Sequence, residues 1–233
     1  MASATVQVNY TTSEGVIVPI ARVNRHKILH FSELAIAQLT PSDHRINPKD
    51  AVTIDRTIVD GKAATRVTKW IDTNSVKEPK QLTVAGLGLE QFDEVVQMYA
   101  AGYAFRLKRE LSGDDLRNAV YEYMHQGSLT AAEFAMIAEL LTFDGGLIKT
   151  TVHEIMFRYN KGGNYTPPDM ANIEAYAKRT GMWEEMLNVG RSMQAGMNER
   201  VGRNAEKARQ DAAKAERARQ DAAKGRQDSV QNP

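Results

Sequence analysis

The chain has 233 residues, of which 42% are hydrophobic and 25% are charged, and its formal net charge is +1. These values are ordinary for a globular protein with a sizeable core. The absence of cysteine excludes a disulfide framework, a thiolate metal site and a cysteine nucleophile. No apolar run approaches the ~20 residues that span a bilayer, and the N-terminal sequence lacks the pattern of a signal peptide. We therefore expect a cytoplasmic protein that does not enter a membrane.

Charge is distributed unevenly along the chain. Residues 1–80 carry eleven Lys or Arg against eight Asp or Glu, residues 81–198 carry ten against fifteen, and residues 199–233 carry nine against six. A mildly acidic middle thus lies between two mildly basic ends, which is compatible with a polyanionic partner. A protein that polymerises along RNA needs only a few cationic contacts in each copy.

Residues 4–20 have the pattern of two short strands. Apolar residues alternate with polar ones, the chain turns at Ser13-Glu14-Gly15, and an apolar run resumes at Val16. Pro19 has no amide hydrogen to donate to a ladder, so the second strand must lie at an edge or end there. Two interpretations remain open: an extended arm that docks on a neighbouring subunit, or an edge hairpin of the chain's own domain.

A short helix is predicted over Phe31–Leu39, which Pro41 helps to stop. The five histidines of the chain match no metal-ligand spacing such as HExxH. We therefore expect no metal site.

The segment around Asp60-Gly61 predicts a β-hairpin. Two runs of β-forming residues flank this dipeptide, which favours a tight type I′ turn. Such a ribbon would contact a nucleic-acid backbone, and its tryptophan would stack on a base. The alternative is a tryptophan that faces the core, with the charges in solvent. The side chains in question are Arg56, Arg66, Lys69 and Trp70. The polar residues 72–81 that follow predict a linker.

Residues 89–111 predict the longest core helix. Apolar residues recur there mostly three or four apart, which places a broad apolar stripe on one side of a helix of about six turns. The cations Arg106, Lys108 and Arg109 come at its end, where positive charge suits a helix C-terminus. These three residues are a second candidate RNA contact.

Short helices with clear boundaries are predicted after residue 111. Ser112–Asp115 is typical of a helix start, Thr130 and Glu133 form a capping-box pattern, and helical spacing resumes from Leu147 to Tyr159. Two further helices are predicted, one ending near Gly181 and one beginning near Trp183.

Residues 161–169 predict a glycine-rich loop between helices. With the residues just before it, this loop gathers cations and aromatics that would accept a phosphate and a stacked base. A simple helix-to-helix connection is the alternative. The members of this third candidate RNA contact are Arg158, Tyr159, Lys161 and Tyr165.

The C-terminal residues 199–233 contain almost no apolar residue other than alanine. The sequence ARQDAAK occurs at 208–214 and again at 218–224, and its residues are strong helix formers. We predict an exposed, charged helix that frays into disorder, without the apolar seam of a coiled coil. It would act as a solubilising or interaction tail, or contact phosphates through its cations.

Enzyme motifs are absent from the sequence. There is no GxSxG, no GxGxxG after a strand and no acidic cluster at metal-ligand spacing. We therefore predict a binding or structural protein rather than an enzyme, with no cofactor.

The predicted fold class is mainly α with a small β-rich N-terminal part, or α+β. The predicted domains are a β-rich arm and hairpin region over 1–80, a helical-bundle core over 81–198 and a charged tail over 199–233. This layout, across most of the chain, resembles the coat or nucleocapsid proteins of plant RNA viruses with filamentous or rod-shaped particles. The resemblance is one of layout and not of motif, so no functional residue is carried over from that family.

The resemblance implies a structural protein that self-assembles around single-stranded RNA, as a viral capsid or nucleocapsid protein does. Its partners would be single-stranded RNA and further copies of itself, joined through the N-terminal arm, and it would be found in the virion and the host cytoplasm. The alternative is a helical adaptor or scaffold that binds another protein and no nucleic acid.

Overall fold

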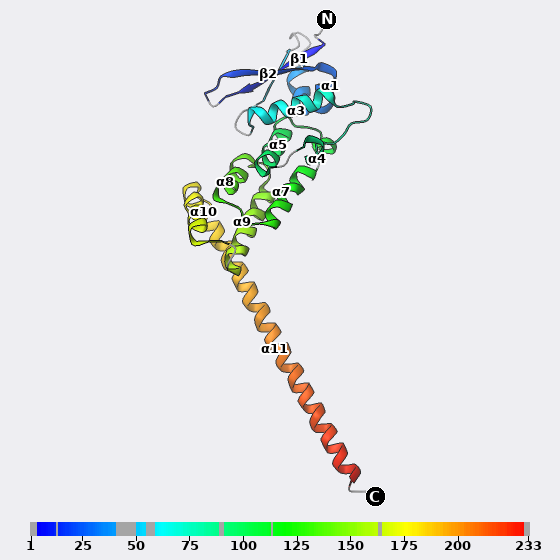
Figure 1. Cartoon of the computed structure of the whole chain (residues 1–233), viewed down its shortest axis with the longest axis vertical. Coiled ribbons are helices and arrows are strands. Elements are labelled where there is room, and N and C mark those ends of the chain that lie inside the picture. Colours follow the sequence, from blue (N-terminus) through cyan, green and yellow to red (C-terminus); the bar gives the residue numbers. More distant parts are fainter. Residues whose placement is uncertain are drawn as a thin grey trace.

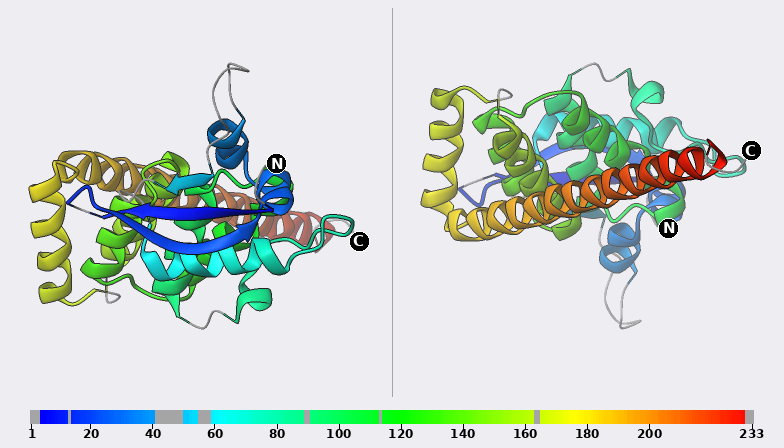
Figure 2. Two further views of the ribbon diagram at one scale, coloured as in Figure 1. Left: turned by 90° about the horizontal axis from the view of Figure 1, so that it is seen from above. Right: turned by 90° about the horizontal axis from the view of Figure 1, so that it is seen from below.

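The computed structural model describes residues 4–12, 14–40, 50–54, 59–88, 91–112, 114–162 and 165–230. These residues form a mainly helical protein with a small N-terminal sheet, which confirms the predicted fold class. Figure 1 shows the sheet at one end of the helical body, while the last helix, α11, projects from the other end. Figure 2 shows from above that the strands lie across the helices beneath them.

Three strands, β1 (Thr5–Thr11), β2 (Ile17–Asn24) and β3 (Ala51–Ile54), form the sheet in the order β2-β1-β3. The central strand β1 pairs antiparallel with β2 and parallel with β3. The predicted strand pair is thus confirmed, and it belongs to the chain's own sheet. Pro19 lies on the edge strand β2 at a register irregularity opposite Asn9, as its missing amide hydrogen requires.

The helix predicted over 31–39 is divided into α1 (Arg25–Phe31) and α2 (Glu33–Leu39). The break is at Ser32, which has an extended backbone and whose hydroxyl accepts the amide hydrogen of Ala35. Asn24 caps α1 in the same way, by accepting the amide hydrogens of His26 and Lys27. Hydroxyl and amide side chains at these positions satisfy amides that a helix leaves unpaired. Pro41 lies outside the described residues.

The predicted hairpin at Asp60-Gly61 is wrong. The structure has a helix there, α3 (Gly61–Thr73), so Arg66, Lys69 and Trp70 are helical residues and form no ribbon. The buried positions recur three or four residues apart, which is the helical period: Ala63, Ala64, Val67, Thr68 and Ile71. Burial of that face against the sheet and α5 outweighs the local β propensity of the segment. Arg56 lies outside the described residues.

The long helix predicted over 89–111 is also wrong in extent. After α4 (Val84–Leu87), α5 runs over Phe92–Ala104, and α6 is a single turn over Arg109–Ser112. Leu89 lies outside the described residues. A reversal at Phe105–Arg106 separates α5 from α6, so the cations Arg106 and Lys108 follow a helix and do not lie within its last turn.

Five helices complete the body: α7 (Asp114–Gln126), α8 (Ala131–Leu140), α9 (Gly145–Lys161), α10 (Pro167–Thr180) and α11 (Trp183–Val230). The capping box of Thr130 and Glu133 is present, with both reciprocal hydrogen bonds, as predicted. Gly181 ends α10 in a left-handed conformation. Buried apolar residues from both the sheet and the helices form one core cluster.

The last helix, α11, is continuous through the region predicted as a separate tail. It packs against α9 near its start, where the Asn160 amide donates to the Gly190 carbonyl over 3.0 Å. Met156 approaches Gly190 so closely that a Cβ there would lie 2.5 Å from its terminal methyl. Residues 198–215 are exposed, so this stretch of helix depends on its own hydrogen bonds and helix propensity.

We expect Gly181→Ala to lower the free energy of unfolding by about 1 kcal/mol, because only glycine adopts a φ of +78° without strain. Gly202→Ala is the matched control, since that glycine is helical and has open space around its Cβ position. The control should keep or raise stability and helicity. Urea denaturation followed by circular dichroism measures both, and equal effects of the two substitutions would contradict this account.

Candidate functional site

An open pocket of about 540 Å³ lies where the start of α2, the end of α5 and the start of α7 meet the turn before α9. Its wall combines aromatic rings with charged side chains of both signs. The residues that matter for its chemistry are Glu33, Tyr103, Arg106, Arg109, Asp114 and Phe143. Its volume is within the range of small-ligand sites.

Ser32 fixes one side of this pocket. Its side chain is completely buried, donates to the Phe105 carbonyl over 2.6 Å and accepts the amide hydrogen of Ala35. The backbones on either side are joined as well, because the Glu33 amide donates to the Arg106 carbonyl and the Lys108 amide to the Phe31 carbonyl. The α1–α2 break is thus held directly against the turn that follows α5.

The turn itself is a Schellman motif. The Leu107 amide donates to the Gly102 carbonyl and the Arg106 amide to the Tyr103 carbonyl, which are the two hydrogen bonds of that motif. Arg106 occupies the left-handed position, with φ +46°, where glycine is usual. A residue with a Cβ is strained there by about 1 kcal/mol. Such strain is often found at functional sites, which directs attention to the Arg106 side chain.

Two stacked rings form an aromatic surface in the pocket. Tyr103 and Phe143 lie with their ring centroids 3.6 Å apart and their planes 4° from parallel. Tyr103 is 49% exposed although it is large and partly apolar. One of its faces is covered by Phe143, and about half of the side chain remains exposed.

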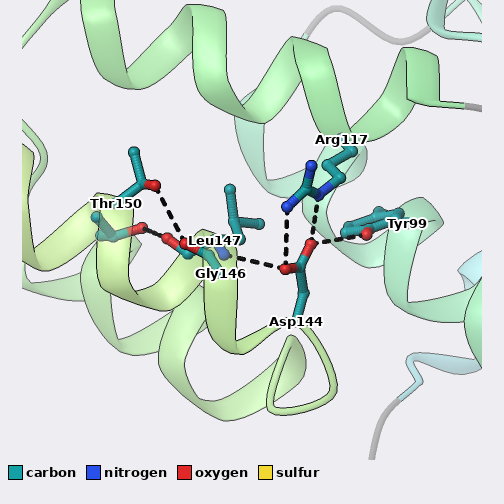
Figure 3. A network of polar contacts seen from close by, with 7 residues as sticks. Tyr99, Arg117, Asp144, Gly146, Leu147 and Thr150 are labelled. Carbon is teal, nitrogen blue, oxygen red and sulfur yellow. Dashed lines mark hydrogen bonds and ion pairs between the residues drawn. The ribbon is translucent and has the colours of Figure 1, made fainter.

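An ion pair lies beside the pocket, and Figure 3 shows its side chains with their hydrogen-bond partners. Two members of this network, Tyr99 and Asp144, line the pocket. The Asp144 carboxylate accepts from Arg117 over 2.6 and 3.2 Å, from the Tyr99 hydroxyl over 2.9 Å and from the Leu147 amide over 3.0 Å. Asp144 is thus both the N-cap of α9 and the point at which α5, α7 and α9 meet. Because Asp144 precedes Gly145 and follows Phe143, the network also fixes the aromatic surface.

Ionisation of this network follows from its geometry. Burial opposes the charge on Asp144, but its bonds to Arg117, Leu147 and Tyr99 outweigh burial, so its pKa is lowered. Burial and the hydrogen bond to Asp144 raise the pKa of Tyr99. The hydrogen bond to Asp144 likewise raises the pKa of Arg117. The network therefore stays an ion pair with a neutral phenol across the physiological range.

Four charged side chains around the pocket lack a partner within the described part of the chain. They are Arg106, Arg109, Glu33 and Asp114, all exposed, and none forms a hydrogen bond or ion pair through its side chain there. Their charges cancel in sum, so the pocket offers donors and acceptors rather than a uniformly positive surface.

The first candidate group does not reach this pocket. Arg66 donates to Glu94 over 2.8 Å, Lys69 is exposed on α3, and Trp70 is half-buried with its ring 5.7 Å from that of Phe31. The core-facing alternative for Trp70 therefore describes its packing better than a base-stacking ribbon does. Trp70 also lines a separate open pocket with Asn74.

The third candidate group lies on and after α9 and not in one loop. Arg158 pairs with Glu154 over 2.9 Å and donates to the carbonyls of Met124 and His125, so it caps the C-terminal end of α7. The Nε and one terminal nitrogen of that guanidinium are therefore engaged within the chain.

The other members of the third group differ in exposure. Tyr159 is half-exposed, and the Lys161 ammonium lies 4.4 Å from the centre of the Phe157 ring. Tyr165 is half-buried, and burial raises its pKa to about 12. The residues 163–164 between them lie outside the described residues.

Of the sequence-predicted residues, the structure thus brings Arg106 and Arg109 together in one pocket, whereas Lys108 is not among the residues that line it. Sequence reasoning missed Glu33, Phe143 and Asp144, which are far from these cations in the chain. Asp144 carried a usable signal, since an aspartate before two glycines and a helical run is typical of an N-cap. Nothing local in the sequence signalled the pairing of Tyr103 with Phe143.

Comparison of the chain with protein-family models, with curated proteins and with solved structures found no match. Within the described ranges, no group of three or more His, Asp or Glu is arranged to hold a metal ion. None of the helices described is long and apolar enough to cross a membrane.

We expect Asp144→Asn to lower the free energy of unfolding by about 2 kcal/mol, because it removes the negative charge that pairs with Arg117. The side chain of Asp144 is 11% exposed and that of Arg117 is 34% exposed, so solvent screens the pair only in part. An asparagine oxygen still accepts the Leu147 amide hydrogen, so the substitution isolates the ion pair from the cap. Urea denaturation at pH 7 measures the loss.

The same pair predicts a pH dependence with a defined sign. The pKa of Asp144 is lower in the folded protein than the unfolded value near 3.8, so the pair's contribution is fully present above that pH. It is lost as the pH falls from there through the folded-state pKa. The difference in stability between the wild type and Asp144→Asn should therefore shrink below pH 3.8. A difference that stays constant down to pH 2 would contradict this assignment.

Proposed function

We propose that the protein is a structural, non-enzymatic RNA-binding protein that assembles with further copies of itself on single-stranded RNA, as viral capsid and nucleocapsid proteins do. One observation carries this proposal. Arg106 on the strained turn and Arg109 just after it line one pocket with the exposed Tyr103, and neither guanidinium has a partner within the described residues.

This combination suits a single strand better than a duplex. Proteins that bind single-stranded nucleic acid stack bases on aromatic rings and hold phosphates with cations beside them. A duplex would offer Tyr103 no base face, because its bases are already stacked. Among the described residues, one copy offers only the cations Arg106 and Arg109 at this pocket. So few cations fit a protein whose affinity comes from many copies bound along one strand.

Self-assembly is supported by the tip of the β1–β2 hairpin. Val16, Ile17 and Val18 are 53%, 60% and 40% exposed, and they are consecutive. Ile17 and Val18 begin strand β2, which is one edge of the sheet, with no further strand paired to it among the described residues. A run of exposed apolar residues at the end of a hairpin is a natural contact for a second copy.

We expect Arg106→Gly to raise the free energy of unfolding by about 0.5–1 kcal/mol, because glycine relieves the strain at positive φ. The same substitution should weaken the binding of single-stranded RNA several-fold, and Arg106→Gly with Arg109→Gln about tenfold or more. The association constant should also depend less steeply on salt. The negative slope of its logarithm against the logarithm of the salt concentration should shrink in magnitude by about 1 for each cation removed. Fluorescence anisotropy with a labelled U-rich oligonucleotide measures the affinity, and urea denaturation the stability.

The matched control is Arg22→Ala with Lys77→Ala, which removes two exposed cations outside the pocket. This control should bind RNA nearly as the wild type does. Equal losses for the control and the pocket variant would mean that binding is diffuse, and unchanged binding by the pocket variant would exclude the pocket.

Assembly is tested by electron microscopy of the protein with and without RNA. We expect rings or filaments that carry RNA, and an elevated A260/A280 ratio in purified material. Ile17→Asp should abolish the assemblies and leave the monomer folded, because that side chain is exposed. A monomer that ignores RNA and captures a defined protein would favour the adaptor function instead.

A further inference from the structure

We infer that the pocket at the turn after α5 binds a guanine base, with the carboxylate of Glu33 as the residue that selects it. This inference rests on the proposed function, because the guanine is presented as part of an RNA strand or as a free guanine nucleotide. It adds a sequence preference that phosphate contacts alone would not give.

Charged residues of both signs line the pocket. A surface that only follows a phosphate backbone is positive, since a carboxylate beside it repels the phosphates. Glu33 and Asp114 nevertheless line the same pocket as Arg106 and Arg109, and within the described residues their carboxylates pair with no cation. A pocket that keeps unpaired donors and acceptors together is suited to a polar, uncharged ring.

The aromatic part of the pocket suits a ligand with a flat ring. Tyr103, stacked on Phe143 at 3.6 Å, offers a flat aromatic surface within the pocket. A nucleobase stacks on such a surface through its own face and leaves its edges to hydrogen bonds. The edges of the base then meet the charged side chains.

The four bases differ in the hydrogen-bond donors and acceptors on their edges. Guanine alone carries two adjacent donors, N1–H and the N2 amino group, on its Watson–Crick edge, and a carboxylate has two oxygens to accept both. Its other edge carries the acceptors O6 and N7, which an arginine binds in a bidentate manner. Adenine, cytosine and uracil each place an acceptor where the second oxygen of a carboxylate would need a donor.

Of the two acidic residues in the pocket, Glu33 is the one whose position is fixed against the turn. Glu33 is held next to the turn because its amide donates to the Arg106 carbonyl over 3.0 Å, and because Ser32 before it is bonded to Phe105. The position of Glu33 relative to Arg106 is therefore fixed by the backbone. Asp114 begins α7, where an acid is already explained by the helix dipole.

The experiment compares U-rich oligonucleotides that carry one central guanosine, adenosine or cytidine with the all-uridine strand, in the full-length protein. We expect the guanosine strand to bind about tenfold more tightly than the others. Glu33→Gln should abolish most of this preference and keep the affinity for the all-uridine strand. Glu184→Gln, at an exposed carboxylate on α11, is the matched control and should keep the preference.

Free guanosine monophosphate distinguishes the source of the base. Competition by it, and not by adenosine monophosphate, means that the pocket also takes the free nucleotide. A guanosine preference without such competition means that the base is bound only within a strand. Both results support guanine recognition.

Equal binding of all four strands, or a preference unchanged in Glu33→Gln, would overturn the inference and leave the proposed RNA binding standing. Loss of binding to every strand by the wild type would overturn both. Glu33→Ala is the second variant if Glu33→Gln unfolds, and a preference unchanged in Glu33→Ala would then overturn the inference.

Discussion

The buried hydroxyl of Ser32 is the contact on which the rest of the arrangement depends. By donating to Phe105 and capping α2 at once, it joins the helices beside the sheet to the turn after α5. A buried carbonyl that lost this donor would be left unsatisfied at a cost of about 1–3 kcal/mol. The break between α1 and α2, the strained turn and the position of Glu33 all follow from this one junction.

The recognition proposed for the turn is opposed to its stability. A Schellman motif is most stable with glycine in the left-handed position, and this chain has Arg106 there instead. In the network around Asp144, which Figure 3 shows, both carboxylate oxygens accept hydrogen bonds. The hydrogen-bonded network and the strained, charged turn would together fix the shape of the proposed site before a ligand arrives.

Sequence patterns predicted the elements that short-range chemistry determines. The capping box at Thr130, the edge position of Pro19 and the end of α10 at Gly181 each depend on a few neighbouring residues. The failures at α3 and after α5 have different causes. Tertiary burial outweighed the β propensity of α3, and a local reversal ended α5 before the predicted C-terminus. The residues that line the pocket with Arg106 could not be predicted, because Glu33 and Phe143 come near it only through the fold.

The helix α11 also governs how the protein moves in solution. Its 48 residues give a rod of about 70 Å, much of it beyond the compact body. Such a rod adds much friction for little mass, so a monomer of 25.9 kDa will diffuse slowly and elute early from a sizing column. Apparent size alone will therefore overstate the number of copies in any assembly, and absolute mass from light scattering is the quantity that counts them.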